Sequence, residues 1–191
     1  SSQLSLAKYI WITADEKNHL NTKEIPDFFQ YMLSRVDFRR DLHFYTKTTI
    51  DTLDYSGTAI NEGSKIVIAA YGDIMRELAS EIPGCVASIE NFSKPVCIFP
   101  GVLALQGKAY LNKENAVKEI DVLIDYLFHY RDELKEFPFI VICDDTDFIS
   151  RSLNNFLWVT FTRSNPANDI SGVGQFMENK HWGCTGPLLI D

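Results

Sequence analysis

The segment Leu157–Asp169, LWVTFTRSNPAND, decides how this chain divides. A helix-like run ends at Arg163, and a polar turn that carries Pro166 follows and closes at Asp169. The segment Gln30–Asp41, QYMLSRVDFRRD, shows the same order of features in the first part of the chain. If both segments belong to a repeated unit, their flanking strands should match as well.

The flanking segments match in that order. YIWITADE, which begins at Tyr9, aligns with FIVICDDT, which begins at Phe139, and GSKIVIAA resembles TGPLLID further along. Three charged positions stay in step across strand, helix and turn: Asp15 with Asp145, Arg35 with Arg163, and Asp41 with Asp169. These matches predict an internal duplication with two related α/β units, 1–84 and 85–191. We expect the units to pack around a pseudo-two-fold axis or to share an extended sheet.

Segments with the pattern of strands alternate with segments that have the period of a helix. The clearest helix begins at Asn115, where apolar residues recur every three or four positions in NAVKEIDVLIDYLFHYRDEL. A shorter helix is predicted over Gly72–Gly84. Several strand segments, such as FPFIVICDD, are continuous apolar runs, which are typical of sheets covered on both faces. The pattern predicts an α/β fold in which mixed sheets are flanked by helices.

The repeated charges have a structural interpretation. Asp15 and Asp145 follow buried strands, and Arg35 and Arg163 end the helices that come next. A partly buried arginine and carboxylate favour a bidentate ion pair, and the loss of one partner costs roughly 3–5 kcal/mol. We therefore predict two structural ion pairs, Asp15–Arg35 and Asp145–Arg163, rather than catalytic groups.

The composition limits the classes of partner and location. The 191 residues carry a net charge of −8, and no run of Lys and Arg forms a basic face, so a nucleic-acid partner is not expected. No apolar run is long enough to span a membrane, and the sequence predicts no metal site. The cysteines lack the C-x-x-C spacing and are interpreted as reduced thiols of a cytoplasmic protein: Cys85, Cys97, Cys143 and Cys184.

The order of YIWITADE, LSRVDFRRD, TIDTLDYSG and GSKIVIAA resembles the C-terminal domain of the UbiD-like decarboxylases, the 3-octaprenyl-4-hydroxybenzoate carboxy-lyase family. That domain carries a strand ending in acidic residues, a helix, an R-x-x-P-x-x-D-like turn, a P-I-D-x-L-D-like loop and a G-S-K strand. The resemblance is close over 9–70 and looser over 139–191. RSNPAND keeps the proline of the turn, whereas Phe38 replaces it in the first copy. The segment from Phe139 onward would then be an extension beyond the usual length of the family.

The resemblance implies an active parent protein rather than an active segment. Members of the family catalyse the reversible, non-oxidative decarboxylation of aromatic or α,β-unsaturated acids, typically ubiquinone and menaquinone precursors. They use prenylated FMN with a divalent metal and a monovalent cation, and the cofactor supplies the electron sink that the carbanion needs. The cofactor and the catalytic Arg and Glu lie in preceding flavin-binding domains. We expect this chain to be a fragment of such a protein that binds no cofactor and is inactive alone.

The resemblance also assigns a role to the loop TTIDTLDYSG, in which Ile50 and Leu53 would line the substrate side of the flavin pocket. Ordinary packing of both residues is the open alternative. The second unit has ISGVGQFMENKHWG at that place and lacks the I-D-x-L-D pattern. The family's C-terminal domain also forms oligomer contacts, so the resemblance implies a homo-oligomer. We expect a dimer, because a half-exposed duplicated α/β unit usually buries its remaining apolar surface.

Two further functions stay open at the level of sequence. The chain could be a structural or oligomerisation module with no catalytic link. Alternatively, Asp144, Asp145 and Asp147 could hold magnesium at a strand end in a receiver-like or phosphatase-like domain. Such a domain also needs a nucleophilic Asp, a Lys and a Thr or Ser on neighbouring strand ends, and we find no such set in the sequence.

Overall fold

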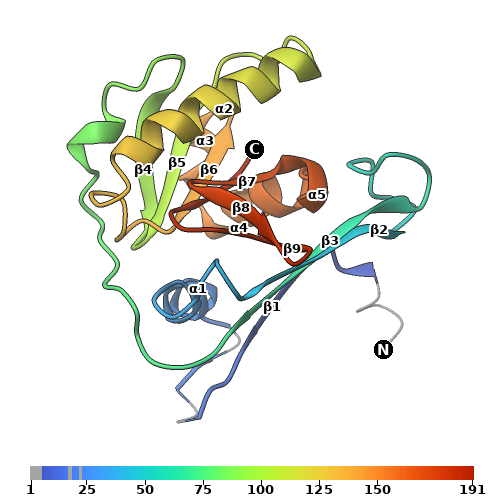
Figure 1. The fold of residues 1–191 in the computed structure, drawn as a ribbon, viewed down its shortest axis with the longest axis horizontal. Helices are drawn as coiled ribbons and strands as arrows, with labels where there is room; N and C mark the ends of the chain where they lie inside the picture. Colours follow the sequence, from blue (N-terminus) through green and yellow to red (C-terminus); the bar gives the residue numbers. More distant parts are fainter. Residues whose placement is uncertain (1–5, 17–18, 22) are drawn as a thin grey trace.

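The computed structural model describes residues 6–16, 19–21 and 23–191, and its first sheet belongs entirely to the first unit (Figure 1). This sheet joins β1 (Tyr9–Thr13), β2 (Leu42–Thr49) and β3 (Glu62–Ala70) in the order β1-β3-β2. β1 is parallel to β3, and β2 is antiparallel to it. Helix α1 (Ile25–Leu33) lies between β1 and β2 in the chain. Its proline is in the first turn, where a missing N–H costs no hydrogen bond.

A five-stranded mixed sheet belongs to the second unit. β5, β6 and β10 are parallel, whereas β4 and β7 are antiparallel edge strands. The order is β4-β5-β6-β10-β7, with these bounds: β4 Ser93–Phe99, β5 Val102–Gln106, β6 Phe139–Cys143, β7 Ile170–Gly172 and β10 Leu188–Ile190. The two sheets and their helices confirm the predicted α/β class with mixed sheets.

Helices and one hairpin connect the strands of the second unit. Helix α2 (Lys113–His129) follows β5, and the Asn112 side chain caps it by accepting the Asn115 N–H. A 3-10 turn (Gly84–Val86) precedes β4. The remaining elements are α3 (Thr146–Ile149), α4 (Leu153–Leu157), a π-helical turn (Trp158–Thr162), α5 (Pro166–Asp169), β8 (Gln175–Glu178) and β9 (His181–Cys184).

Both faces of the five-stranded sheet are buried. Alternate residues of a strand point to opposite faces, and each face packs into its own hydrophobic core. Leu103 and Ile140 face α2, whose Leu123 and Leu127 are fully buried in the same core. Val102, Phe139 and their alternates belong to the other core, which includes α1 and the first sheet. Helices α1 and α2 accordingly lie on opposite sides of the five-stranded sheet (Figure 1). This arrangement explains the continuous apolar runs of its strands.

The core between the two sheets contains side chains from both units. Phe29 of α1 meets Phe156 of α4, with ring centroids 6.0 Å apart, and stacks on Phe161 at 5.9 Å. Trp11 of β1 contacts Phe139 of β6, also at 5.9 Å. The two units are therefore joined by one hydrophobic core.

The strands β6, β10 and β7 have the same arrangement as β1, β3 and β2. In each set the middle strand is parallel to the first and antiparallel to the third. The registers also agree: Tyr9 pairs with Ile66 and Leu42 with Ile68, as Phe139 pairs with Leu188 and Ile170 with Ile190.

The turn that precedes the third strand of each set has one geometry. The Asp41 carboxylate accepts the Asp37 N–H at 2.9 Å, and the Asp169 carboxylate accepts the Asn165 N–H at 2.5 Å. In both turns the same aspartate donates its own N–H to the carbonyl four residues before it. The aligned aspartates thus close equivalent turns, with and without a proline.

The helix predicted over Gly72–Gly84 is absent from the structure, apart from the 3-10 turn that begins at its last residue. The backbone N–H groups of Met75 and Arg76 donate to the Ser34 carbonyl, and the Arg76 guanidinium donates to the Leu33 and Val36 carbonyls. This segment therefore donates hydrogen bonds to the free carbonyl groups at the end of α1 instead of forming its own helix. Tertiary hydrogen bonds outweigh the weak propensity of a short run.

Candidate functional site

The connection between β2 and β3 holds the residues that the resemblance assigned to a pocket wall. Asp51 and Asp54 shape it, because each side chain accepts the backbone N–H two residues further on, that of Leu53 or Ser56, at 2.9 Å. The Ser56 hydroxyl also donates to Asp54 at 2.7 Å. The sequence TTIDTLDYSG therefore forms a defined turn.

The structure separates the two predicted wall residues. Ile50 is 3% exposed and packs against Gly57 and Gly63, where an added Cβ would lie 2.6 and 2.8 Å from its side chain. Leu53 is 76% exposed. Ile50 is thus buried in the core, whereas the Leu53 side chain is accessible from the surface.

Leu53 lines a surface groove of about 600 Å³ between the two units. The turn at 51–56 and Lys8 form one wall, and a segment that includes Trp158 and Arg163 forms the other. We take this groove as the candidate functional site, because the exposed residue of the family-like loop meets the second unit here.

Lys8 holds the two walls of the groove together. Its ammonium pairs with Asp54 at 2.9 Å and donates to Ser56 Oγ at 2.8 Å. It also donates to the carbonyl oxygens of Thr162 and Ser164, at 3.1 and 2.8 Å. The side chains of Lys8 and Asp54 are 8% and 14% exposed. Because this nearly buried charge is surrounded by oxygen partners, the turn is fixed against the second unit.

The neighbouring Tyr9 adds a second contact between the units. Its hydroxyl lies 2.5 Å from Ser164 Oγ, and Ser164 in turn donates to the Thr160 carbonyl at 2.7 Å. Tyr9 is therefore the donor in the pair. Burial raises the pKa of Tyr9 well above its usual value, so the phenol stays neutral and keeps its donor hydrogen.

The pKa of Asp54 lies below its ordinary value. Burial of the carboxyl acts to raise it, but hydrogen bonds from Lys8 and Ser56 outweigh burial. Because the folded-state pKa is below the unfolded value, the pair stabilises the fold above about pH 4. That contribution is lost as the pH falls through the folded-state pKa.

We expect Asp54→Asn to lower the free energy of unfolding by about 1.5–3 kcal/mol at neutral pH, the usual range for hydrogen bonds to charged groups. The variant should also lose less stability than wild type on acidification, because it lacks the titrating carboxyl. Urea unfolding between neutral pH and about pH 2.5 measures both effects. An acid-dependent loss as large as that of wild type would contradict the assignment.

The structure does not join Asp15 to Arg35. The Asp15 carboxylate accepts the backbone N–H groups of His19 and Leu20, both at 2.9 Å. The Arg35 guanidinium lies 3.6 Å from the ring centroid of Tyr31. It also donates to the Ser34 hydroxyl at 3.0 Å.

The second predicted pair, Asp145 with Arg163, is not formed either. Asp145 caps α3 by accepting the Phe148 N–H at 3.0 Å, and the Arg163 guanidinium lies 4.3 Å from the Trp158 ring centroid. In each unit the arginine stacks on an aromatic ring of its own helical segment, since a planar guanidinium fits a ring face well. The carboxylates keep a structural role, but as acceptors of backbone N–H groups.

Sequence reasoning missed Lys8 and Trp158. Lys8 bonds to Thr162 and Ser164, which lie 154 and 156 residues away in the chain, so no local pattern marks it. Trp158 could have been found from the repeat, because an aromatic residue precedes the aligned arginine in both copies: Tyr31 precedes Arg35, and Trp158 precedes Arg163. The extra residue of the π-helical turn shifts that spacing by one position.

Three general findings accompany the site. Within the described residues, no group of three or more His, Cys, Asp or Glu could hold a metal ion. In the same part of the chain, no helix is both long and apolar enough to cross a membrane. All four cysteines are free thiols.

Comparisons with known proteins give a consistent result. A family model described as the 3-octaprenyl-4-hydroxybenzoate carboxy-lyase C-terminal domain (UbiD_C) matches residues 1–70. An uncharacterized protein of Chlamydia caviae is 33% identical over 189 residues, which are 99% of this chain and 30% of that protein. A Chlamydia pneumoniae protein whose name makes it a subunit of 4-hydroxybenzoate decarboxylase is 31% identical over 190 residues, with the same shares.

These matches divide at the end of β3. The family match stops at Ala70, the last residue of β3, whereas the chlamydial similarity continues through the second unit. The chain spans about 30% of the length of these curated relatives.

Proposed function

We propose that this chain, which is a UbiD-like C-terminal region continued by a second α/β unit, is part of a decarboxylase that acts on aromatic or α,β-unsaturated acids of the quinone-precursor type. The observation that carries the proposal is the family match over residues 1–70, which contain the Leu53 turn. The Chlamydia pneumoniae relative, named for 4-hydroxybenzoate decarboxylase, supports the substrate class. The rest of a longer UbiD-type chain would supply the chemistry.

The cofactor of such an enzyme is prenylated FMN with a divalent and a monovalent cation, and it would supply the electron sink for decarboxylation. Where the structure describes the chain, its residues do not fit a site for it. The described residues include no metal-holding group. Of the basic side chains that line the groove, Lys8 is already engaged by Asp54 and Ser56, and the Arg163 guanidinium lies over the Trp158 ring. We therefore place the cofactor on the preceding flavin-binding domains and assign this chain no catalytic step.

The role that we propose for this chain is to support assembly and to contribute an apolar wall. The turn is rigid, because two Asx-type hydrogen bonds and the Lys8 contacts fix it, yet Leu53 stays exposed. A rigid apolar side chain on the surface suits contact with a neighbouring domain or with the body of an aromatic acid. Another exposed apolar side chain that lines the groove beside Leu53, Tyr55, is available for contacts between the protomers of a homo-oligomer.

Two further proposals concern the history and location of the chain. The shared strand order, registers and turn geometry support an internal duplication of units 1–84 and 85–191. The free cysteines support a reducing, cytoplasmic location.

The test is decarboxylation by the full-length parent protein, reconstituted with prenylated FMN, with and without this region. Aromatic and unsaturated acids serve as substrates, and molecular mass is recorded in parallel. We expect activity and oligomer mass to disappear together. Loss of mass with full activity would favour the purely structural module, and survival of both would contradict the proposed role.

A point substitution distinguishes a direct apolar contact by Leu53 from a purely structural role of this chain. We expect Leu53→Asp in the full-length protein to reduce kcat/KM by about tenfold or more, since it places a charge against an apolar contact. The stability of this chain should change by less than about 0.5 kcal/mol, because Leu53 is exposed. Ile60→Asp is the matched control, because Ile60 is 88% exposed on the same connection but does not line the groove. Equal effects of both substitutions on kcat/KM would contradict a specific role for Leu53.

A further inference from the structure

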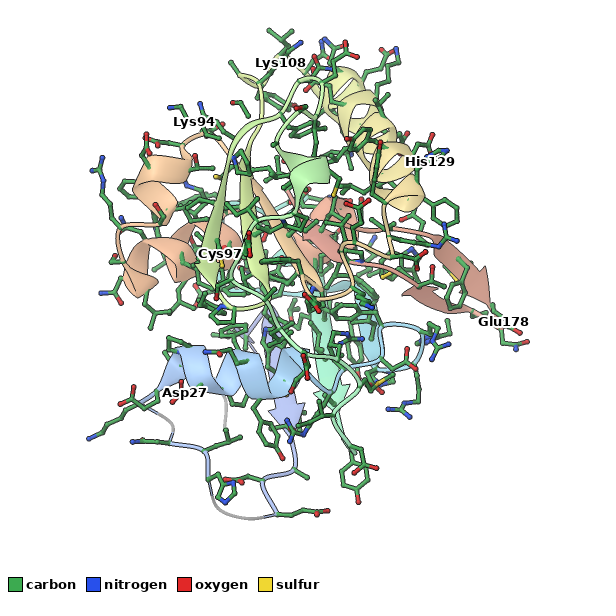
Figure 2. The ribbon with its side chains drawn as sticks, turned by 90° about the vertical axis from the view of Figure 1, so that its left-hand side faces the viewer. Asp27, Lys94, Cys97, Lys108, His129 and Glu178 are labelled. Atoms are coloured by element: carbon green, nitrogen blue, oxygen red, sulfur yellow. The ribbon has the colours of Figure 1, made fainter. Side chains whose placement is uncertain are left out.

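A second and larger cavity, of about 680 Å³, lies at the carboxyl ends of β5 and β6 in the second unit. Residues after β5, such as Lys108, and after β6, such as Asp144, line it together with the first turns of α2. Figure 2 shows Lys108 near the start of α2, with His129 at the other end of that helix. The cavity therefore opens at the Lys108 end of the five-stranded sheet.

The topology makes this end of the sheet a natural binding crevice. The chain leaves β5 toward α2, which packs on one face of the sheet, and leaves β6 toward α4, whose Phe156 packs on the other face. Neighbouring parallel strands whose connections depart to opposite faces open a crevice between their carboxyl ends. Ligands of open α/β sheets bind at such positions.

The walls of the cavity are largely apolar and aromatic. Phe148 and Trp158 form one side, with ring centroids 6.1 Å apart in an edge-to-face arrangement. Tyr110 and Leu111 line the cavity while being 70% and 75% exposed. This volume and these walls suit the body of a small organic molecule, because ligand cavities usually measure about 300–1,000 Å³.

The charges that line the cavity are mostly negative. Lys108 and Arg163 are its basic side chains, and the Arg163 guanidinium covers the Trp158 ring. Burial, with the charges of Asp169, Asp144 and Glu119, raises the pKa of Asp191 to about 6. The carboxylates are more numerous: Glu119, Asp144, Asp145, Asp169 and Asp191. A cation in this place would relieve their mutual repulsion.

We propose that this cavity binds an organic cation with an apolar or aromatic body, of the arylalkylamine type. The apolar walls would contact the body of the ligand, and Asp144 and its neighbours would contact the ammonium group. Carboxylate contacts to an ammonium are charge-assisted and stronger than neutral hydrogen bonds. This cavity adjoins the groove of the Leu53 turn, because Trp158 and Arg163 line both, but the proposal does not depend on the decarboxylase proposal.

Three indoles with two-carbon side chains that end in groups of different charge test the proposal: tryptamine, its neutral alcohol tryptophol, and indole-3-acetate. Calorimetric titration of the full-length protein near pH 7.5 should show one site for tryptamine. Binding of tryptophol should be about tenfold weaker, the difference between a charge-assisted and a neutral hydrogen bond. Indole-3-acetate should bind more weakly still. Equal affinities, tighter binding of indole-3-acetate, or no binding of tryptamine up to about 10 mM would overturn the proposal.

Two matched pairs of variants locate the site. Asp144→Asn should weaken tryptamine by about threefold to tenfold and leave tryptophol unchanged, whereas Asp147→Asn should change neither. Asp147 follows the same strand but pairs with Lys94 and does not line the cavity. Ala116→Phe should fill the cavity and abolish binding of both, while Val117→Phe, on the outer side of α2, should not. Unchanged tryptamine binding in Asp144→Asn or Ala116→Phe would place the ligand elsewhere and overturn the assignment.

Discussion

Replacing Lys8 by Met is expected to lower the free energy of unfolding by about 3–5 kcal/mol, the range for removing one partner of a buried ion pair. Methionine keeps the apolar stem of Lys8 but leaves the Asp54 carboxylate without its cation. The carbonyl oxygens of Thr162 and Ser164 lose a donor at the same time. Each of these oxygen atoms then either stays buried without a hydrogen-bond donor or is hydrated by water that enters between the units, and both are unfavourable.

Urea unfolding and the melting temperature measure this effect. For a chain of this size, each kcal/mol shifts Tm by about 2–4 °C, so a decrease of about 6–20 °C is expected. Lys47→Met is the matched control, because the Lys47–Glu62 pair is exposed and 3.5 Å long, and it should cost less than about 1 kcal/mol. Lys8→Met with no larger effect than Lys47→Met would contradict the proposed anchor.

A second substitution separates charge from packing. Asp54→Asn in the Lys8→Met background removes the unpaired charge, so it should be less harmful there than in wild type. If the two losses simply add, Lys8 and Asp54 are not coupled, and the turn that carries Leu53 is held by its own Asx-type bonds alone.

The strands and the long helix could be predicted from sequence because their signals are local. β6 is a continuous apolar run, and α2 carries a regular stripe that faces one core. The resemblance located the turn with Ile50 and Leu53, but burial then divided the two residues. A sequence pattern gives the position of a residue along the chain. The burial of Ile50 depends instead on Gly57, in the same connection, and on Gly63 of β3, which both lie against its side chain.

The errors have a common cause, which is competition from contacts that local patterns do not show. The predicted helix over 72–84 gave way to hydrogen bonds with the end of α1. The predicted ion pairs are replaced by cation–π contacts. Tyr31 lies beside Arg35, and Trp158 lies beside Arg163, in the same helical segment. The cavity at the ends of β5 and β6 could be predicted only in part. The sequence pattern places Asp144 and Asp145 at the end of a strand, but it does not indicate which other residues line a cavity beside them.

Replacing Phe156 by Ala is expected to lower the free energy of unfolding by about 3–5 kcal/mol, the usual cost of removing a buried phenylalanine side chain. Phe156 is fully buried, and its ring lies within 6.0 Å of Phe29 in the first unit and 5.2 Å of Phe99 in the second. A cavity at this point faces both units. Phe128→Ala is the control, because Phe128 is 42% exposed and should cost much less.

Native-state hydrogen exchange shows whether the shared core makes the two units one cooperative structure. In Phe156→Ala, amides of β3 should lose protection by the same free energy as amides of β6, although Phe156 belongs to the second unit. Loss of protection in β6 alone would mean that the units unfold independently. In that case the core contacts between Phe29 and Phe156 would join two separate folds. A common loss would mean that the first unit depends on the second for its stability, which gives a physical reason for keeping both units in one chain.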